Sequence, residues 1–261
     1  MIAHSADPRT IRFKVRRQDT PDSPPYWERF DVPYKPNLNI ISCLQWIAAN
    51  PRTAEGRQTT PVVWDSTCLE EVCGACTMVI NGGVCQSCST LVDQLLNNAG
   101  EGSTIVLEPM SKFPVVRDLW VDRRRMFDAL VTVRGWVPID GTHDLGPGPT
   151  EPPARQQTRY ALSRCMTCGC CLEACPQFTL DNNFIGAQAI AQALYFNLHE
   201  TGKELKDDRL ETLEAPGGIA DCGNAQNCVK VCPKNVPLTE SIAAIGRQTT
   251  VHVFKKFFTG K

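Results

Sequence analysis

The spacing of the cysteines constrains this chain more than any other feature. The chain has 261 residues, of which 14 are cysteines, well above average usage. Apart from Cys43 they form three groups, with five cysteines between residues 68 and 88, five between 165 and 175 and three between 222 and 232. The N-terminal sequence is too polar for a signal peptide, so we expect a reducing compartment, where disulfides are rare. Metal binding is therefore the first explanation to test.

Charge and hydropathy exclude two kinds of partner contact. Lys and Arg total 27 against 28 Asp and Glu, a formal net charge of -1, which provides no basic excess for nucleic acid. The two longest uncharged stretches, 72–92 and 182–199, contain too many polar residues to cross a bilayer. We therefore expect no nucleic-acid binding, and attachment to a membrane would need another chain.

Residues 1–112 predict a mixed domain. Alternating apolar and polar residues predict strands, and apolar residues at helical spacing predict one helix that Pro51 ends. The expected strands are 10–15, 30–32, 77–80 and 103–108, and the expected helix is 39–49. Asn81-Gly82 is a strong hairpin signal. Cys43 is expected to be a small buried hydrophobic residue of the helix.

Residues 113–261 predict a connector followed by a helical domain, so the fold class is α+β. The connector contains the run Arg123–Arg125, expected on a solvated helix face, and the sequence Leu145 to Pro149, which excludes regular structure. Helices are expected over 186–198 and 238–245. The apolar and basic segment 251–258 suits either a capping helix of the core or an amphipathic contact with a membrane partner.

The first cysteine group has the opening spacing of plant-type [2Fe–2S] ferredoxins. The candidate ligands are Cys68, Cys73 and Cys76, in the pattern C-x4-C-x2-C. Gly74 and Ala75 are small, which lets the backbone direct N–H groups at bound sulfur. Spacing alone leaves the fourth ligand open between Cys85 and Cys88. A zinc knuckle or a reactive thiol is the alternative explanation.

The second group matches the bacterial ferredoxin run in full. Its cysteines are Cys165, Cys168, Cys171 and Cys175, followed by Pro176. In that pattern the fourth cysteine ligates the other cluster of the pair. Cys170 is out of rhythm, and we expect it to be buried beside the ligands without binding.

The third group repeats this rhythm with one thiol missing, because Ala225 stands where the second cysteine is expected. Its members are Cys222, Cys228 and Cys232, followed by Pro233. If the fourth cysteines cross over, one set is Cys165, Cys168, Cys171 and Cys232, and the other is Cys175, Cys222 and Cys228. Four thiolates suit [4Fe–4S] and three suit [3Fe–4S]. The alternative for the second set is a four-iron cluster completed by another residue or a non-protein ligand.

We find no candidate catalytic residue in the sequence. There is no P-loop, no dinucleotide fingerprint and no haem-attachment motif. The histidines are scattered and expected at the surface; they are His4, His143, His199 and His252. The chain therefore resembles an electron conductor between sites on other chains.

Four segments resemble the iron–sulfur subunit of succinate dehydrogenase and fumarate reductase, in respiratory complex II. They are WDSTCLEEVCGACTMVING, FPVVRDLWVDR, CMTCGCCLEACP and CGNAQNCVKVCPKNVPLTESIAA. The resemblance implies an N-terminal β-grasp ferredoxin domain and a C-terminal helical ferredoxin-like domain. It implies that Cys88 rather than Cys85 completes the [2Fe–2S] set, and it implies the crossover between the other two sets.

The resemblance also implies partners and a reaction. A separate flavoprotein with FAD would oxidise succinate, and electrons would pass through [2Fe–2S], [4Fe–4S] and [3Fe–4S] to a quinone. That quinone would bind where this subunit meets a membrane cytochrome b. The subunit would lie peripherally on the cytoplasmic face of the cell membrane, held by the membrane subunit.

Two departures point to one branch of the family. Many ubiquinone-reducing members have a Trp pair after the Cys-Pro and a His after the first cysteine of the third group, but here these places hold Gln177 to Leu180 and Gly223. Pro176 is the one usual quinone contact that remains. Together with EVCGACTMVING and PIDGTHDLGPGP, this resembles the menaquinone-linked bacterial branch, which uses a single membrane subunit with two b haems.

Three alternatives remain open. The complex could run in reverse as a fumarate reductase, or the chain could be a free multi-cluster ferredoxin. A structural zinc protein would be colourless, whereas an iron–sulfur protein would be brown. Co-purification with a flavoprotein and a haem-bearing membrane protein would distinguish the enzyme subunit from the free carrier.

Overall fold

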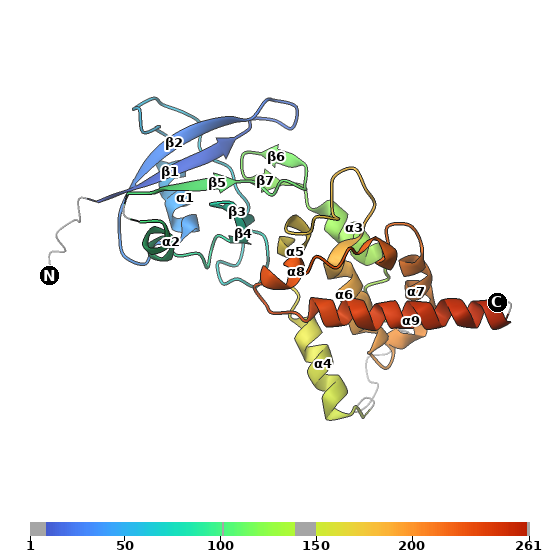
Figure 1. Ribbon diagram of the computed structural model, residues 1–261. Helices are drawn as coiled ribbons and strands as arrows, with labels where there is room; N and C mark the ends of the chain where they lie inside the picture. The colour runs from blue at the N-terminus through green and yellow to red at the C-terminus, as the bar shows by residue number, and fades with distance from the viewer. Residues whose placement is uncertain (1–8, 101, 139–149, 260–261) are drawn as a thin grey trace. The chain divides into compact units, whose positions relative to one another are not determined.

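The structure, a computed structural model, describes residues 9–100, 102–138 and 150–259 (Figure 1). The chain divides into two compact units, one ending at Asp122 and the other beginning at Arg123. Leu145 to Pro149, most of the segment PIDGTHDLGPGP, His4 and His143 lie outside the described residues. The α+β class is confirmed, because the first unit contains the sheet and the second is helical.

The first unit is built on a five-stranded mixed sheet with strand order β2-β1-β5-β3-β4. The strands are β1 (Thr10–Arg17), β2 (Tyr26–Pro33), β3 (Thr77–Ile80), β4 (Gly83–Gln86) and β5 (Thr104–Glu108). β1 and β5 pair in parallel, with Phe13 opposite Ile105, and the other pairs are antiparallel. Asn81 and Gly82 have φ values of 50° and 79° at the β3–β4 turn, as their hairpin signal predicts.

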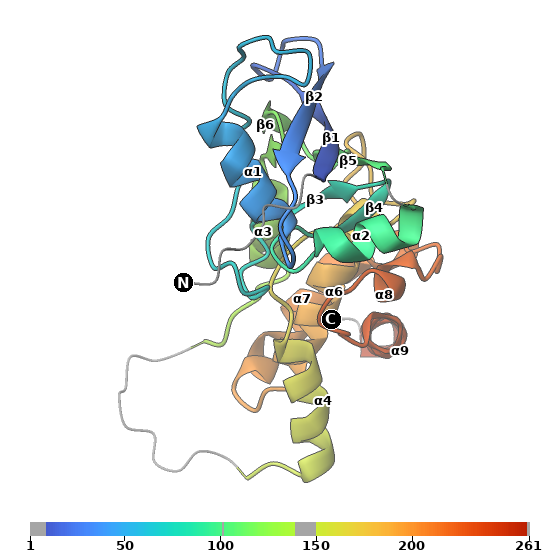
Figure 2. The ribbon, with the colours of Figure 1, turned by 90° about the vertical axis from the view of Figure 1, so that its left-hand side faces the viewer.

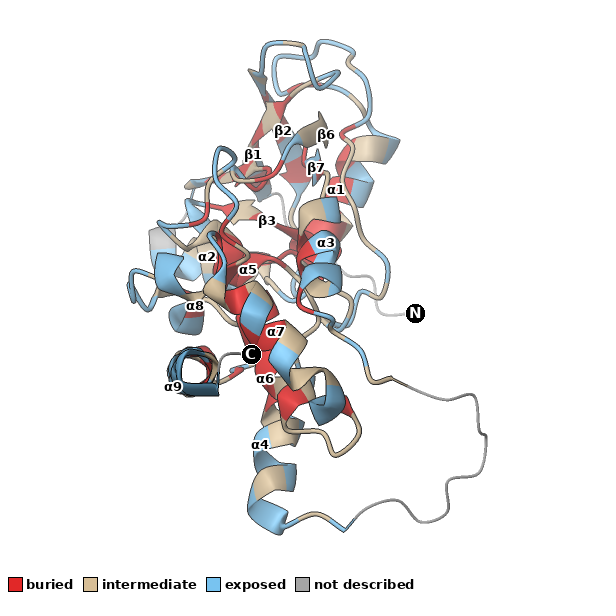
Figure 3. Ribbon diagram, turned by 90° about the vertical axis from the view of Figure 1, so that its right-hand side faces the viewer, coloured by how far each residue is buried: buried red, intermediate tan, exposed pale blue. Residues whose placement is uncertain are grey.

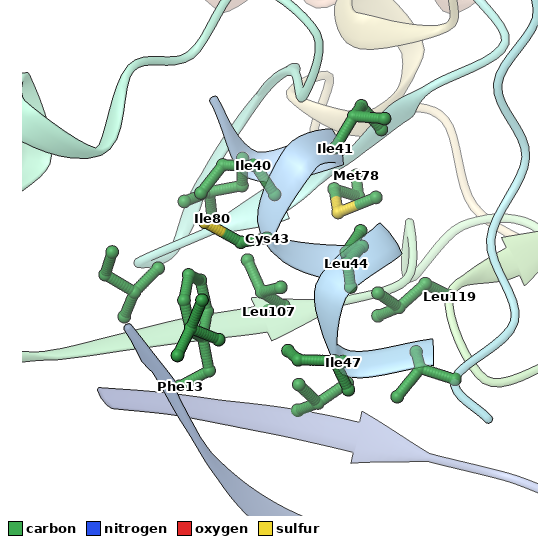
Figure 4. Close-up of a cluster of buried hydrophobic side chains, with 14 of the residues drawn as sticks. Phe13, Ile40, Ile41, Cys43, Leu44, Ile47, Met78, Ile80, Leu107 and Leu119 are labelled. Atoms are coloured by element: carbon green, nitrogen blue, oxygen red, sulfur yellow. The ribbon is translucent and has the colours of Figure 1, made fainter. Parts of the chain in front are cut away.

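Helix α1 (Ile40–Ala49) supplies five buried residues to the core of this unit and lies beside the sheet (Figure 2). The side chain of Asn39 accepts the N–H of Ser42 at 2.8 Å, which caps the helix start. Ile40, Leu44 and Ile47 point from α1 toward Phe13 and Leu107 of the sheet (Figure 4), and all five are fully buried. Helix α2 (Val92–Ala99) follows β4. Cys43 is completely buried, as expected, and burial raises its pKa to about 12.

An ion network is buried in the first unit and has no signal in the sequence. Arg17, which is 0 % exposed, pairs with both Glu28 and Asp118, and its Nε lies 2.8 Å from Asp118 Oδ1. Asp118 lies in the turn between the short strands β6 (Val115–Arg117) and β7 (Trp120–Val121). Its other oxygen accepts the N–H of Val63 at 2.9 Å. The network therefore holds the segment that leads into the first cysteine loop.

The second unit packs its helices around α6 (Gly186–Asn197), nine of whose twelve residues are buried (Figure 3). The other helices are α3 (Arg124–Thr132), α4 (Pro153–Ser163), α5 (Cys170–Glu173), α7 (Lys206–Glu214), α8 (Asn227–Lys230) and α9 (Leu238–Thr259), with 3-10 turns at Gly202–Leu205 and Ile219–Asp221. α6 begins at Gly186, with φ at 81°. A Cβ there would lie 2.1 Å from Leu172 Cδ2, so glycine permits the close approach of α5 to α6.

Helix α9 is longer than predicted, because it continues without a break to Thr259. Its inner stripe, including Ser241, Ile245 and Thr249, is buried. Its outer face near the C-terminal end is exposed, with Phe257 at 80 % and Phe258 at 78 %. The helix thus both packs on the core and presents an apolar face. Among the helices in the described ranges, none is long and apolar enough to cross a membrane.

Two side-chain expectations in this unit are wrong. His252 is buried and contacts Glu214 at 2.6 Å, because it belongs to the inner stripe of α9. Arg124 is exposed as predicted for the run Arg123–Arg125, but Arg125 is half-buried. Its guanidinium lies 4.0 Å from the ring centre of Phe178 and donates to three backbone carbonyls between residues 179 and 184. It therefore ties the start of α3 to the segment that precedes α6.

Candidate functional site

The first cysteine loop wraps around the sulfur of its own first cysteine. Leu69, Glu71 and Gly74 have φ values of 59°, 56° and 71°, and these left-handed residues turn the backbone N–H groups inward. The N–H groups of Glu70 and Val72 both lie 3.4 Å from Cys68 Sγ. These donors, with a further hydrogen bond from the Cys73 side chain, lower the pKa of Cys68 to about 7. The loop thus favours the thiolate, the form that binds metal.

The side-chain contacts distinguish Cys88 from Cys85 as the candidate for the fourth ligand of the first group. The side chain and the backbone N–H of Cys88 both lie within hydrogen-bonding range of the buried Cys76 sulfur. Burial raises the pKa of Cys76 to about 12. Cys85 instead contacts Thr90 Oγ1 at 3.5 Å and packs against the hydrophobic core. The structure therefore brings Cys88 to the loop and directs Cys85 elsewhere.

One cavity of the second unit, the four-cysteine cavity, is named for the four predicted ligands that line it from two distant segments. They are Cys165, Cys168, Cys171 and Cys232, and Cys170 lies in the same wall. Burial raises the pKa of Cys165 to about 11, whereas a hydrogen bond from the Cys170 side chain is the main cause that lowers the pKa of Cys168 to about 7. The positive charge of Arg123 acts in the same direction. Cys170 is buried as expected, but it contacts the sulfur of Cys168 directly.

A second cavity is lined by three cysteines and by the residue that breaks the rhythm. The three are Cys175, Cys222 and Cys228, and Ala225 lies in the same wall. Asn224 and Gln226 on either side of Ala225 are left-handed, with φ values of 52° and 60°. Burial raises the pKa of Cys228, and the neighbouring Cys175 and Cys222 act in the same direction. Cys232 therefore shares a cavity with cysteines of segment 165–171, and Cys175 shares one with Cys222 and Cys228.

Pro176, the predicted quinone contact, and Gly223, one of the two departures from the ubiquinone pattern, line this three-cysteine cavity. A Cβ built on Gly223 would lie 2.6 Å from Gln177 Nε2. The Gln177 side chain therefore fills the space that a larger residue at position 223 would need. A larger residue at position 223 would therefore require the flexible end of the Gln177 side chain to move.

The side chains at the first cysteine loop and at the two cavities suit iron–sulfur clusters. Thiol side chains surround each site, and backbone N–H groups approach several sulfurs, including Cys232 Sγ from Val236 at 3.4 Å. In the part of the chain that the structure describes, no three Cys, His, Asp or Glu side chains converge around a single metal ion. A cluster is larger than one ion, so its thiolates stand farther apart than the ligands of one zinc.

Sequence profiles of two known domain families match the two units. A 2Fe-2S iron–sulfur cluster binding domain matches residues 12–128, and a 4Fe-4S dicluster domain matches residues 161–236. The chain is thus a two-domain iron–sulfur protein of the ferredoxin type, with domains that bind [2Fe–2S] and [4Fe–4S] clusters.

Curated relatives define the family more narrowly. The chain is 56 % identical over 253 residues to the succinate dehydrogenase iron–sulfur subunit of Bacillus subtilis, covering 97 % of this chain and 98 % of the relative. It is 28 % identical to the fumarate reductase iron–sulfur subunit of Wolinella succinogenes, covering 92 % and 96 %. The chain therefore belongs to the family of succinate dehydrogenase and fumarate reductase iron–sulfur subunits, as an electron-transfer subunit of succinate dehydrogenase.

A solved structure shows the same fold. It is the Mycobacterium smegmatis Sdh1 complex in the apo form, one chain of which superposes with a TM-score of 0.72 at 19 % identity. The match covers 95 % of this chain and 98 % of that one.

Proposed function

We propose that the three cysteine sets hold three different clusters. Cys68, Cys73, Cys76 and Cys88 would bind [2Fe–2S]; Cys165, Cys168, Cys171 and Cys232 would bind [4Fe–4S]; Cys175, Cys222 and Cys228 would bind [3Fe–4S]. The observation that carries this proposal is how the cysteines of the ferredoxin pattern divide between the two cavities of the second unit. One cavity holds four of them, beside the out-of-pattern Cys170, and the other holds three and Ala225. A missing thiolate leaves one corner of a cubane without a protein ligand.

The clusters, when bound, would supply one-electron carriers between the FAD of a flavoprotein subunit and a quinone. The chain's own residues bind them, exclude water and set their electrostatic surroundings. Buried thiols such as Cys171 and Cys228 place the sulfurs away from solvent, and loop N–H groups offset the negative charge. The identity of 56 % to a succinate dehydrogenase subunit, against 28 % to a fumarate reductase subunit, favours succinate oxidation over the reverse reaction.

The quinone is proposed to be menaquinone, bound near Pro176 where this subunit meets its membrane partner. The support is local: Pro176 lies in the wall of the three-cysteine cavity, and Gln177 occupies the space beside Gly223. The membrane partner is proposed to be a single-chain cytochrome b with two b haems. It would hold this subunit peripherally on the cytoplasmic face of the cell membrane.

The experiment is purification of the native complex from membranes. We expect a flavoprotein, this chain and one haem-bearing membrane protein in equal amounts, with two b haems and bound menaquinone. Mössbauer and EPR spectra should resolve [2Fe–2S], [4Fe–4S] and [3Fe–4S] in equal amounts. A zinc-containing colourless chain, or an iron–sulfur chain that purifies alone as a competent carrier, would contradict the proposal.

A further inference from the structure

Gln188 is a buried amide in the wall of the four-cysteine cavity, and no motif predicts it. It is the third residue of α6, lies among the cavity-lining residues and is 1 % exposed. Its Oε1 has no hydrogen-bond partner, and its Nε2 makes one long contact, 3.4 Å to Thr167 Oγ1. A buried amide with four hydrogen-bonding positions and one long contact is costly.

The neighbours of Gln188 define what could satisfy it. Thr167 lies within hydrogen-bonding range of Cys165 through both its backbone N–H and its hydroxyl. An iron–sulfur cluster offers sulfur acceptors and no donors, so an amide oxygen facing it would stay unpaired and would be repelled. An amide NH2 group facing it would find acceptors and a favourable charge.

A half-turn of the amide about its last bond gives its oxygen a donor and places its NH2 group where no protein atom competes for it. Oxygen and nitrogen then exchange places without changing the shape of the side chain. Oε1 accepts the hydroxyl proton of Thr167, and Cys165 keeps the backbone N–H of Thr167. Both N–H bonds of Nε2 are then free to meet the sulfurs in the cavity.

We propose that Gln188 donates an amide hydrogen bond to the cluster held by the four-cysteine cavity and thereby raises its reduction potential. This inference rests on the proposed [4Fe–4S] assignment. The direction follows because reduction adds one negative charge to the cluster, which strengthens a hydrogen bond from a fixed donor. Gln188 would stabilise the charge of the reduced cluster through this hydrogen bond and would not ligate iron.

The test is the Gln188→Leu variant in the assembled complex, with the midpoint potential of each cluster measured by EPR-monitored redox titration. Loss of one charge-assisted hydrogen bond should lower the one-electron reduction constant of the four-iron cluster roughly tenfold, which is about 59 mV for a one-electron couple. The one-electron reduction constants of [2Fe–2S] and [3Fe–4S] in the same sample should stay within about twofold of the parent values.

Two further variants control for packing. Gln192 lies one turn later on α6 and donates instead to the carbonyl of Leu162 at 3.3 Å, so Gln192→Leu should leave the four-iron potential unchanged. Gln188→Met keeps the length of the side chain and removes both amide groups, so it should lower the potential as far as Gln188→Leu. It also tests the proposal if Gln188→Leu fails to assemble.

The outcomes are distinguishable. Unchanged four-iron potentials in both Gln188 variants would overturn the inference and leave the cluster assignment intact. An equal fall in Gln192→Leu would attribute the effect to helix packing and would also overturn it. If the parent complex lacks a four-iron signal, the assignment itself fails, whatever the variants show.

Discussion

Ala187 and Gln188 are consecutive residues at the start of α6, yet they line different cavities. Ala187 lies in the wall of the three-cysteine cavity and Gln188 in that of the four-cysteine cavity. Consecutive helix residues point about 100° apart, so one helix end can face two sites. The first-turn N–H groups of a helix carry partial positive charge. The start of α6 therefore directs positive potential at both proposed clusters.

Replacing Ala225 by cysteine should restore the missing thiol of the three-cysteine cavity. We expect Ala225→Cys to convert the three-iron cluster toward [4Fe–4S], because four thiolates would then line the cavity. The oxidised [3Fe–4S] EPR signal should fall and the iron content per chain should rise. Ala220→Cys, an exposed position a few residues earlier, should change neither quantity. An undiminished [3Fe–4S] signal in Ala225→Cys would contradict the crossover.

Cys88 and Cys85 should differ sharply when each is changed to serine. Cys88→Ser removes a thiol beside Cys76 and should abolish or strongly deplete the [2Fe–2S] EPR signal. Cys85→Ser changes a thiol that contacts Thr90 and should leave the signal within about twofold of the parent. The reverse pattern would show that Cys85 is the fourth ligand.

Arg17 should be a major contributor to the stability of the first unit. Arg17→Met leaves Glu28 and Asp118 buried without their shared cation, and breaking a buried pair typically costs about 3–5 kcal/mol. Arg29→Met removes the exposed pair with Glu55, where both side chains are more than half exposed, and should cost about 0–1 kcal/mol. Urea unfolding of the full chain, followed by visible circular dichroism of the [2Fe–2S] cluster, measures both. Equal losses of unfolding free energy in Arg17→Met and Arg29→Met would show that burial does not make the Arg17 network more stabilising than an exposed ion pair.

Arg125 should stabilise the segment before α6. Arg125→Leu leaves three carbonyls between residues 179 and 184 without their donor, and we expect a loss of roughly 2–3 kcal/mol. Arg124→Leu changes the exposed neighbour and should stay within about 0.5 kcal/mol. Denaturant unfolding and the rate of proteolysis within 177–185 provide two measurements. An Arg125→Leu protein as stable as Arg124→Leu would show that water replaces the guanidinium without cost.

His199 should make the second unit less stable in mild acid. Its Nδ1 accepts the N–H groups of Thr201 and Gly202, both at 3.1 Å, which requires the neutral ring. Burial, with the charge of Arg159, lowers its pKa below the ordinary value of 6.5. Below about pH 6.5 the unfolded chain therefore binds more protons than the folded one, so stability falls as the pH falls toward the folded pKa.

The His199→Asn variant isolates this effect. It keeps an acceptor for the two N–H groups and cannot be protonated, so its stability should depend less steeply on pH just below 6.5. Denaturant unfolding at several pH values measures the difference between the two proteins. Parallel stability curves would exclude His199 as the titrating group.

Local sequence was sufficient for the elements whose signals are local. The alternation in β1, the apolar spacing and Asn39 cap of α1, and the Asn81-Gly82 turn each act within a few residues, and each forms as predicted. The predicted length of α9 and the predicted surface position of His252 were wrong, because both depend on packing against other helices. An isolated helix pattern does not show where tertiary contacts will extend it.

The sequence by itself determined the three cysteine rhythms and the missing thiol at Ala225, because loop-borne metal ligands must follow fixed local spacings. Only the tertiary structure decided the long-range relations. It brought Cys88 rather than Cys85 to Cys76, Cys232 to Cys165, and Asp118 to Arg17 across 101 residues. It also placed Gln188 in the wall of the cavity that Cys165 and Cys232 line. Such contacts depend on how distant segments pack in three dimensions, and no local pattern encodes them.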